Sequence, residues 1–159
     1  MITAQPAIEL RGRGLPADPI FVVDPGLTCG IAVWRPGHEI TVSTVPLAEL
    51  PYELDAEAHR NCLSFIVVEN FHLDSRSARS QAGSDMPAPQ GIGMCRAVSA
   101  LSGTPLFLSP RGCKSAGKAY IEAGHIPGGA EVRAACRNEH ERDVVDILAY
   151  TLRELQRKP

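Results

Sequence analysis

Two short, wholly apolar runs constrain the fold of this chain more than any other feature. Residues 20–23 read Ile-Phe-Val-Val and residues 65–68 read Phe-Ile-Val-Val, and a carboxylate follows each run at once, Asp24 or Glu69. Runs of this length and composition are typical of strands buried on both faces, at the centre of a sheet that helices cover. The sequence therefore predicts a layered α/β domain.

The segments around these runs predict the rest of the sheet. Residues 30–34 and 39–45 follow the first run closely enough to form an antiparallel meander with it. A fifth strand is expected over 105–108, and helices are expected over 48–62, 90–101, 114–123 and 141–157. This order fits a mixed five-stranded sheet, with a three-strand antiparallel meander, two parallel strands and helices on both faces.

Length and composition predict one domain over residues 19–159, preceded by a flexible arm over 1–18. The first residues lack the apolar core of a signal peptide, and no apolar run is long enough to span a bilayer, so we expect a cytoplasmic protein without a membrane partner. The five cysteines are widely spaced and odd in number, which favours reduced thiols. A zinc site would use Cys113, His125, Cys136 and His140, but their intervals match no zinc-finger pattern, so we favour core cysteines and surface histidines.

Charge is distributed unevenly along the chain. The formal net charge is −2, yet residues 71–120 hold six basic and two acidic side chains and are therefore net positive. On charge alone we favour an unevenly charged, solvated surface. If the chain binds nucleic acid, this stretch supplies the phosphate contacts. Arg76 and Arg79 would lie in a loop able to close on a branch point, and Lys114 and Lys118 would share one helix face.

Four carboxylates fall at positions where they could meet. If the two apolar strands are parallel neighbours, Asp24 and Glu69 leave the sheet at the same edge. Asp143 and Asp146 are three residues apart and share a helix face that could cross this edge. Taken singly, Asp24 could open a turn and Asp143 could be a first-turn acid. Together they suit Mg²⁺ or Mn²⁺, and two such ions about 3.5–4 Å apart can hydrolyse a phosphodiester.

At this point the chain resembles the RuvC family of Holliday-junction resolvases, within the RNase H-like superfamily. Four stretches carry the resemblance: FVVDPGLTCG at 21–30, IVVE at 66–69, PQGIG at 89–93 with SPRGCK at 109–114, and DVVDILA at 143–149. The first and last of these are the more specific. The compact size would suit a phage or mobile-element version of the family.

The resemblance implies a Mg²⁺-dependent homodimer that binds four-way DNA junctions and nicks two strands symmetrically. It implies Asp24, Glu69, Asp143 and Asp146 as catalytic metal ligands. Some family members use a histidine on the last helix, so His140 with Asp143 is an alternative ligand pair. Lys114 and Lys118 are implied in phosphate contact or charge neutralisation, and Phe71 as an aromatic wedge. A solvated helix face and a buried phenylalanine are the alternative interpretations of these three residues.

Three other functions stay open at this stage. A sugar-kinase or actin-like ATPase could open its phosphate loop at residues 24–26, but this chain is too short for the second lobe that such proteins need. A nuclease with the same core could act on RNA, as in ribosomal RNA processing, or on other DNA structures. A DNA-binding scaffold without catalysis is disfavoured because all four acids are present.

Overall fold

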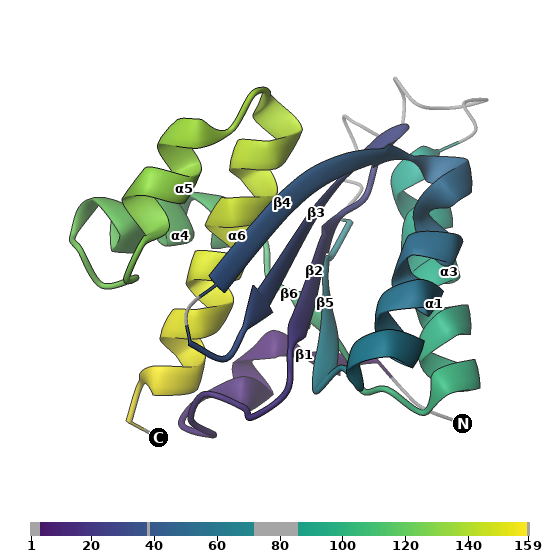
Figure 1. The fold of residues 1–159 in the computed structure, drawn as a ribbon, viewed down its shortest axis with the longest axis horizontal. Helices are drawn as coiled ribbons and strands as arrows, with labels where there is room; N and C mark the ends of the chain where they lie inside the picture. The colour runs from purple at the N-terminus through teal and green to yellow at the C-terminus, as the bar shows by residue number, and fades with distance from the viewer. Residues whose placement is uncertain (1–3, 38, 72–85, 159) are drawn as a thin grey trace.

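The computed structural model describes residues 4–37, 39–71 and 86–158. A single twisted sheet lies at its centre, with helices on both faces (Figure 1). Its strands are β1 (Gln5–Pro6), β2 (Ile20–Asp24), β3 (Thr28–Arg35), β4 (Glu39–Pro46), β5 (Phe65–Glu69) and β6 (Leu106–Ser109). Their order across the sheet is β1-β6-β5-β2-β3-β4.

The pairing of the strands confirms the predicted architecture. β2, β3 and β4 form the antiparallel meander, while β5 and β6 run parallel to β2. The two apolar runs are neighbours, with Val22 opposite Val67 and Val23 opposite Val68. The sheet has one strand more than predicted, since β1 pairs in parallel with β6 at its edge.

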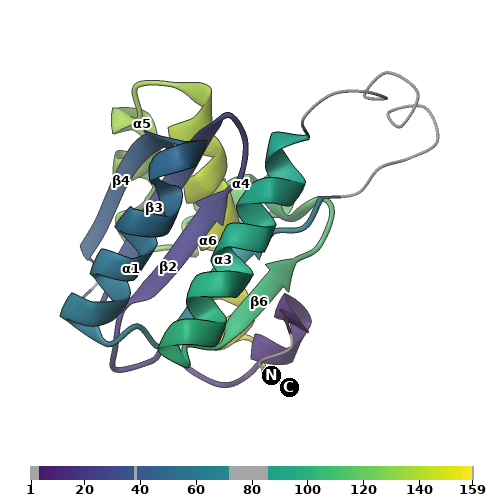
Figure 2. The ribbon, with the colours of Figure 1, turned by 90° about the vertical axis from the view of Figure 1, so that its right-hand side faces the viewer.

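Helices cover each face of the sheet over a separate apolar core. α1 (Leu50–Asn61) and α3 (Pro87–Ser102) lie on one face, and α4 (Cys113–Glu122), α5 (Gly129–Ala135) and α6 (Glu139–Gln156) lie on the other (Figures 1 and 2). Because strand side chains alternate between faces, Val22 and Val67 pack with α6 while Val23 and Val68 pack with α1 and α3. None of the helices in the described ranges is both long and apolar enough to cross a membrane.

The N-terminal segment differs from the flexible arm expected over residues 1–18. In its described part, β1 is followed by the 3-10 helix η1 (Ala7–Leu10), and Ala7 and Leu10 are fully buried in the core under α6. The Gly12 backbone N–H donates to the Glu154 carbonyl oxygen at 3.1 Å, and Arg11 forms an ion pair with the Glu154 carboxylate at 2.8 Å. The expected arm is thus corrected to a packed extension of the domain.

α5 is a second difference from the sequence prediction. No helix was expected between residues 123 and 141, but α5 begins directly after Gly128, whose φ of +72° lies in the left-handed region that favours glycine. α5 packs against α4 and α6. Its Arg133 side chain also contacts the buried Asp146 of α6, one of the four predicted metal ligands.

Candidate active site

Asp24 and Glu69 lie side by side at the carboxyl edge of the sheet. They directly follow Val23 and Val68, the last two residues that pair β2 with β5. Since side chains alternate along a strand, both acids point to the face that α6 covers. Asp24 is buried, with 7 % of its surface exposed, whereas Glu69 is half-buried. The register of β2 and β5 therefore places the two acidic side chains next to each other.

A glycine in β3 lets the first turn of α6 approach this edge. Gly30 pairs with Asp24 across β2 and β3. A Cβ atom at Gly30 would overlap the His140 carbonyl oxygen, so any larger residue would push the helix away. The Asn138 side chain caps α6 by accepting a hydrogen bond from the Glu141 backbone N–H at 3.0 Å. α6 thereby carries Asp143 to the two strand-end acids.

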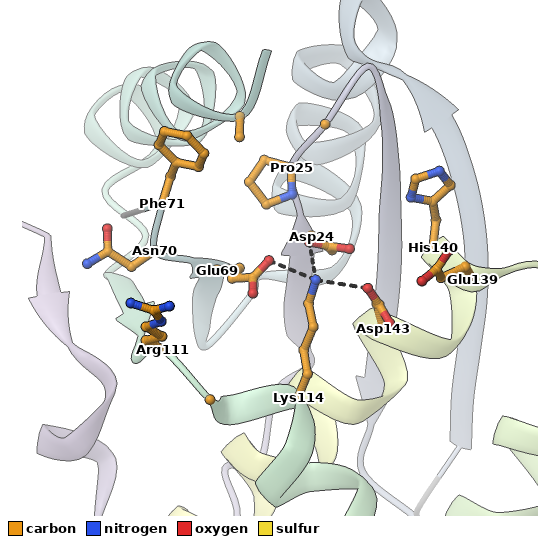
Figure 3. A pocket seen from close by; sticks show the side chains of 13 residues that line it. Asp24, Pro25, Glu69, Asn70, Phe71, Arg111, Lys114, Glu139, His140 and Asp143 are labelled. Carbon is orange, nitrogen blue, oxygen red and sulfur yellow. Dashed lines mark hydrogen bonds and ion pairs between the residues drawn. The ribbon is translucent and has the colours of Figure 1, made fainter. Parts of the chain in front are cut away.

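Lys114, near the start of α4, lies between these three carboxylates. Its Nζ atom is 3.1 Å from Asp24 Oδ1, 2.9 Å from Glu69 Oε2 and 2.9 Å from Asp143 Oδ2 (Figure 3). We call Asp24, Glu69, Asp143 and Lys114 the carboxylate–lysine cluster. Four elements that are far apart in the sequence thus supply one site, at which acidic side chains surround a positive charge.

Burial and mutual repulsion perturb the ionisation of the carboxylate–lysine cluster. Burial, the side-chain hydrogen bond with Glu69 and the Glu69 charge raise the pKa of Asp24 to about 8, against the opposing effect of Lys114. Burial lowers the pKa of Lys114, but the contacts with Asp24, Asp143 and Glu69 outweigh it, so the net change is upward. When ionised, three carboxylates against one ammonium leave an excess of two negative charges, a condition that favours a further cation.

The carboxylate–lysine cluster lines a cavity of about 470 Å³. Glu139 and His140 from α6 line one side of this cavity, and Asn70, Phe71 and Arg111 line the other (Figure 3). His140 is exposed, one turn before Asp143 on α6. We call this cavity the catalytic cleft.

Asp146 lies outside the catalytic cleft, although the sequence made it a candidate ligand. It is 3 % exposed and forms two hydrogen bonds with Arg133 of α5, Nε to Oδ1 at 2.7 Å and a terminal nitrogen to Oδ2 at 3.0 Å. The structure thus brings together three of the four predicted acids. On α6, His140 and Asp143 face the cleft, which is the arrangement of the alternative ligand pair.

Comparison with solved structures places this arrangement among known folds. RuvC from T. thermophilus in complex with a Holliday junction substrate aligns with a TM-score of 0.59 at 18% identity, over 84% of this chain and 91% of that chain. A second Thermus thermophilus RuvC structure aligns with a TM-score of 0.56 at 17% identity, over 84% and 92%. The chain has a RuvC-type fold.

A further solved structure aligns more weakly, and the two sequence comparisons found no match. The yeast mitochondrial Holliday junction resolvase Ydc2 aligns with a TM-score of 0.47 at 13% identity, over 89% of this chain and 81% of that chain. No protein-family model matches the sequence, and no curated protein matches it. The RuvC-type fold confirms the fold class predicted from the sequence, while the chemistry has to be argued from the site itself.

The remaining predicted site residues lie in different surroundings on this RuvC-type fold. Phe71 lines the catalytic cleft but is half-buried and packs against the core under α1 and α3. Lys118 is exposed on α4 and 3.8 Å from the Glu122 carboxylate, so it does not join the cluster. Arg76 and Arg79 lie outside the described residues.

Sequence reasoning missed three residues that the structure places at or near the site. Arg111 lies within the SPRGCK stretch at 109–114 and could have been noted there as a basic residue after a strand. Asn70 directly follows Glu69 and lines the same cleft. Arg133 is the partner of Asp146, and nothing in the local sequence indicated this pair because it depends on the packing of α5 against α6.

The donor atoms of the carboxylate–lysine cluster suit a hard divalent cation. Carboxylate oxygens are the ligands that Mg²⁺ and Mn²⁺ prefer, and imidazole is compatible with Mn²⁺. In the ranges that the structure describes, no three His, Cys, Asp or Glu side chains form a ready-made ion site. The three acids instead converge on the Lys114 ammonium, so they already enclose a positive charge. The residues present therefore fit a metal-dependent site in which Lys114 shares the carboxylates.

Proposed function

We propose that this chain is a metal-dependent endonuclease that cleaves phosphodiester bonds in branched DNA, with four-way junctions as its substrate. One observation carries the proposal: Asp24, Glu69 and Asp143 converge from β2, β5 and α6 on one positive charge in an open cleft. The RuvC-type fold is consistent with this function, since the T. thermophilus neighbour is described in complex with a Holliday junction substrate.

We propose Asp24, Glu69, Asp143 and His140 as the residues that would hold Mg²⁺ or Mn²⁺, two ions in all. His140 replaces Asp146 in this set because His140 lines the catalytic cleft while Asp146 is bonded to Arg133. Bound divalent ions activate water and stabilise the leaving oxygen in phosphodiester hydrolysis. Asp146 and Arg133 are positioning residues, which hold α5 against α6.

The chain's own residues supply the rest of the chemistry. Hydrolysis joins a water oxygen to phosphorus, breaks the bond from phosphorus to the leaving oxygen, and needs a proton acceptor for the water. The strand-end carboxylates would orient the water and accept that proton. Lys114, already among them at 2.9–3.1 Å, would stabilise the negative charge that develops on the phosphoryl oxygens.

Arg111, which lies within the net positive stretch over residues 71–120, would contact phosphates beside the cleft. We further propose a homodimer, because two cleavage sites are needed to nick a four-way junction symmetrically. The resemblance to RuvC proteins supports this assembly.

Cleavage of a substrate panel tests the proposal. End-labelled four-way junction, linear duplex of matched sequence and RNA duplex would be incubated with the chain in Mg²⁺ or in EDTA. We expect paired nicks in the junction with Mg²⁺ and none in EDTA. Cleavage of RNA alone would identify a ribonuclease with this core, and binding of the junction without any cleavage would identify a catalytically silent scaffold.

Two matched variants make the panel specific to the cluster. Asp24→Asn should lower junction cleavage by about 100-fold or more, since it removes a ligand on which the reaction depends. Asp55→Asn, an exposed acid of α1, should leave cleavage unchanged. Equal rates for the two variants would contradict the role of the carboxylate–lysine cluster.

A further inference from the structure

A second cavity lies next to the catalytic cleft, at the edge of the sheet where β1 pairs with β6. Its volume is about 390 Å³, within the range of about 300–1,000 Å³ that is typical of small-ligand pockets. It lies at the carboxyl ends of two parallel strands, on the same sheet edge as Asp24 and Glu69. We call it the β1–β6 pocket.

The lining of the β1–β6 pocket is mainly apolar and includes one aromatic ring. Pro6 and Ala7 come from the N-terminal segment, Leu108 and Pro110 from the end of β6, and Tyr150 from α6. Tyr150 is 9 % exposed, so it adds a small aromatic surface to a mainly apolar lining. Apolar and aromatic side chains of this kind receive a flat, weakly polar ring such as that of a nucleobase. The pocket exists because residues 4–10 fold onto β6 instead of extending as an arm.

Asn70 and Arg111 line both cavities, so the two cavities adjoin at these residues. Figure 3 shows both residues on the opposite side of Glu69 from Asp143 and His140. Arg111 is exposed and forms no ion pair with another residue of the described ranges. A guanidinium at this junction suits a phosphate oxygen of a strand that passes from one cavity to the other.

The distance between the two cavities fits a single nucleotide. Asp143 and Tyr150 are seven residues apart on α6, so they lie on the same side of the helix, about 10 Å apart along its axis. A sugar and base attached to a phosphate at the carboxylate–lysine cluster can span this distance. A base that reaches the β1–β6 pocket must leave its stack, which costs least at a branch point or an unpaired position.

We infer that the β1–β6 pocket binds one unstacked nucleobase of the strand being cut, adjacent to the scissile phosphate. The inference rests on the proposed nuclease function and adds a binding site to it. It makes the N-terminal segment, which has no part in the carboxylate–lysine cluster, a determinant of where the strand is cut.

An abasic scan tests the inference on the unaltered protein. Four junctions would each carry one abasic site, at the first or second nucleotide on either side of the cut. Their affinity for the protein would be measured in Ca²⁺ and their cleavage in Mg²⁺. At one position, removal of the base should weaken binding by about tenfold, as expected for loss of one base stacked on an aromatic side chain. If the junction is cleaved but all four abasic junctions bind with the same affinity as the intact junction, the inference is overturned and the proposed function stays intact. Absence of cleavage of every substrate would overturn both.

A pair of variants assigns the effect to this pocket. Pro6→Trp places a bulky ring in the β1–β6 pocket and should lower affinity for the intact junction to that for the sensitive abasic junction. Gln5→Trp adds the same ring on the neighbouring exposed residue of β1, which does not line the pocket, and should keep the tenfold difference. Retention of the full abasic effect in Pro6→Trp would place the base elsewhere and contradict the assignment.

Discussion

At the scale of single residues, Lys114 connects the stability of the fold to its proposed chemistry. Its ammonium contacts Asp24, Glu69 and Asp143, and its side chain is 29% exposed. Crowded carboxylates destabilise a metal-free protein by mutual repulsion. The structure shows that a lysine from α4 partly compensates them. Lys114 therefore has a structural role before any phosphate arrives.

Replacement of this lysine should expose the repulsion. Lys114→Met leaves three carboxylates without their cation, so we expect the Tm of the metal-free protein to fall by about 3–8 °C. Mg²⁺ should then raise the Tm of this variant more than that of the unaltered protein. Thermal melts with Mg²⁺ and with EDTA check this, and Lys118→Met is the control because Lys118 is exposed. A Lys114→Met variant that melts at the unaltered temperature in EDTA would contradict the account.

Cysteine reactivity provides an independent check of burial. Burial, together with the nearby Cys29 thiol, raises the pKa of Cys95 to about 12, whereas Cys62 is exposed at the end of α1. Because the thiolate is the reactive form, iodoacetamide at pH 8 should alkylate Cys62 quickly and Cys95 only after unfolding. Peptide mass spectrometry over a time course measures both rates. Comparable rates in the folded protein would show that Cys95 is not buried.

At the scale of helices and strands, two glycines set the position of α6. Gly30 lets its first turn approach β3, and Gly117 lets α4 cross it at Asp146. A Cβ atom at either glycine would overlap a backbone carbonyl oxygen of α6, which cannot move alone. Since Lys114 lies on α4 and Asp143 on α6, the crossing at Gly117 also determines how these two side chains meet.

Alanine substitutions test this crossing. Gly117→Ala should lower the free energy of unfolding by about 2 kcal/mol or more, because α4 and α6 must separate. Gly93→Ala, in α3, meets no atom within 4 Å and should raise the free energy of unfolding by about 0.5–1 kcal/mol. Urea denaturation measures both. A Gly117→Ala variant as stable as Gly93→Ala would mean that the helices do not cross this closely.

The same scale explains how far the sequence could predict the fold. The apolar runs predicted β2 and β5, because this feature depends on local pattern. A parallel pairing of the two runs then put Asp24 and Glu69 at the same edge of the sheet. β1 has two residues, Gln5–Pro6, and no apolar pattern of its own. Its pairing depends on the docking of Leu10 under α6, which is a long-range contact.

The incomplete assignment of the site has a related cause. A buried acid on α6 needs a partner, and without knowledge of α5 the partner of Asp146 could be taken for a metal ion. The structure places Arg133 of α5 in that position. The spacing of three residues fits both His140 with Asp143 and Asp143 with Asp146, so spacing alone could not choose between the two pairs.

At the scale of the whole molecule, charge is separated along the chain. The net charge of −2 disfavours non-specific binding to nucleic acid, while the net positive stretch over 71–120 offers phosphates a local site. Binding should therefore be strongly dependent on salt. The sequence suggested equal phosphate contacts for Lys114 and Lys118, but Lys114 is already held by three carboxylates.

Salt dependence tests the predicted phosphate contact of Lys118. Lys118→Ala should lower the slope of log affinity against log salt by about one for each lost phosphate contact, or by about two if a dimer binds the junction. Arg60→Ala, at the end of α1 on the opposite edge of the sheet, should leave the slope unchanged. Junction affinity over a salt series in Ca²⁺ measures the slopes. Equal slopes for both variants and the unaltered protein would contradict a contact at Lys118.

Phosphodiester cleavage should depend on Asp24, Glu69 and Asp143 around Lys114, with Asp146 outside the reacting group. Single-turnover cleavage of a four-way junction in Mg²⁺ by Asp143→Asn and Asp146→Asn tests it most directly, with rates corrected for the folded fraction. We expect the cleavage rate to fall by about 100-fold or more for Asp143→Asn and to stay within about tenfold of the unaltered protein for Asp146→Asn. The reverse order, with Asp146→Asn inactive and Asp143→Asn active, would contradict it.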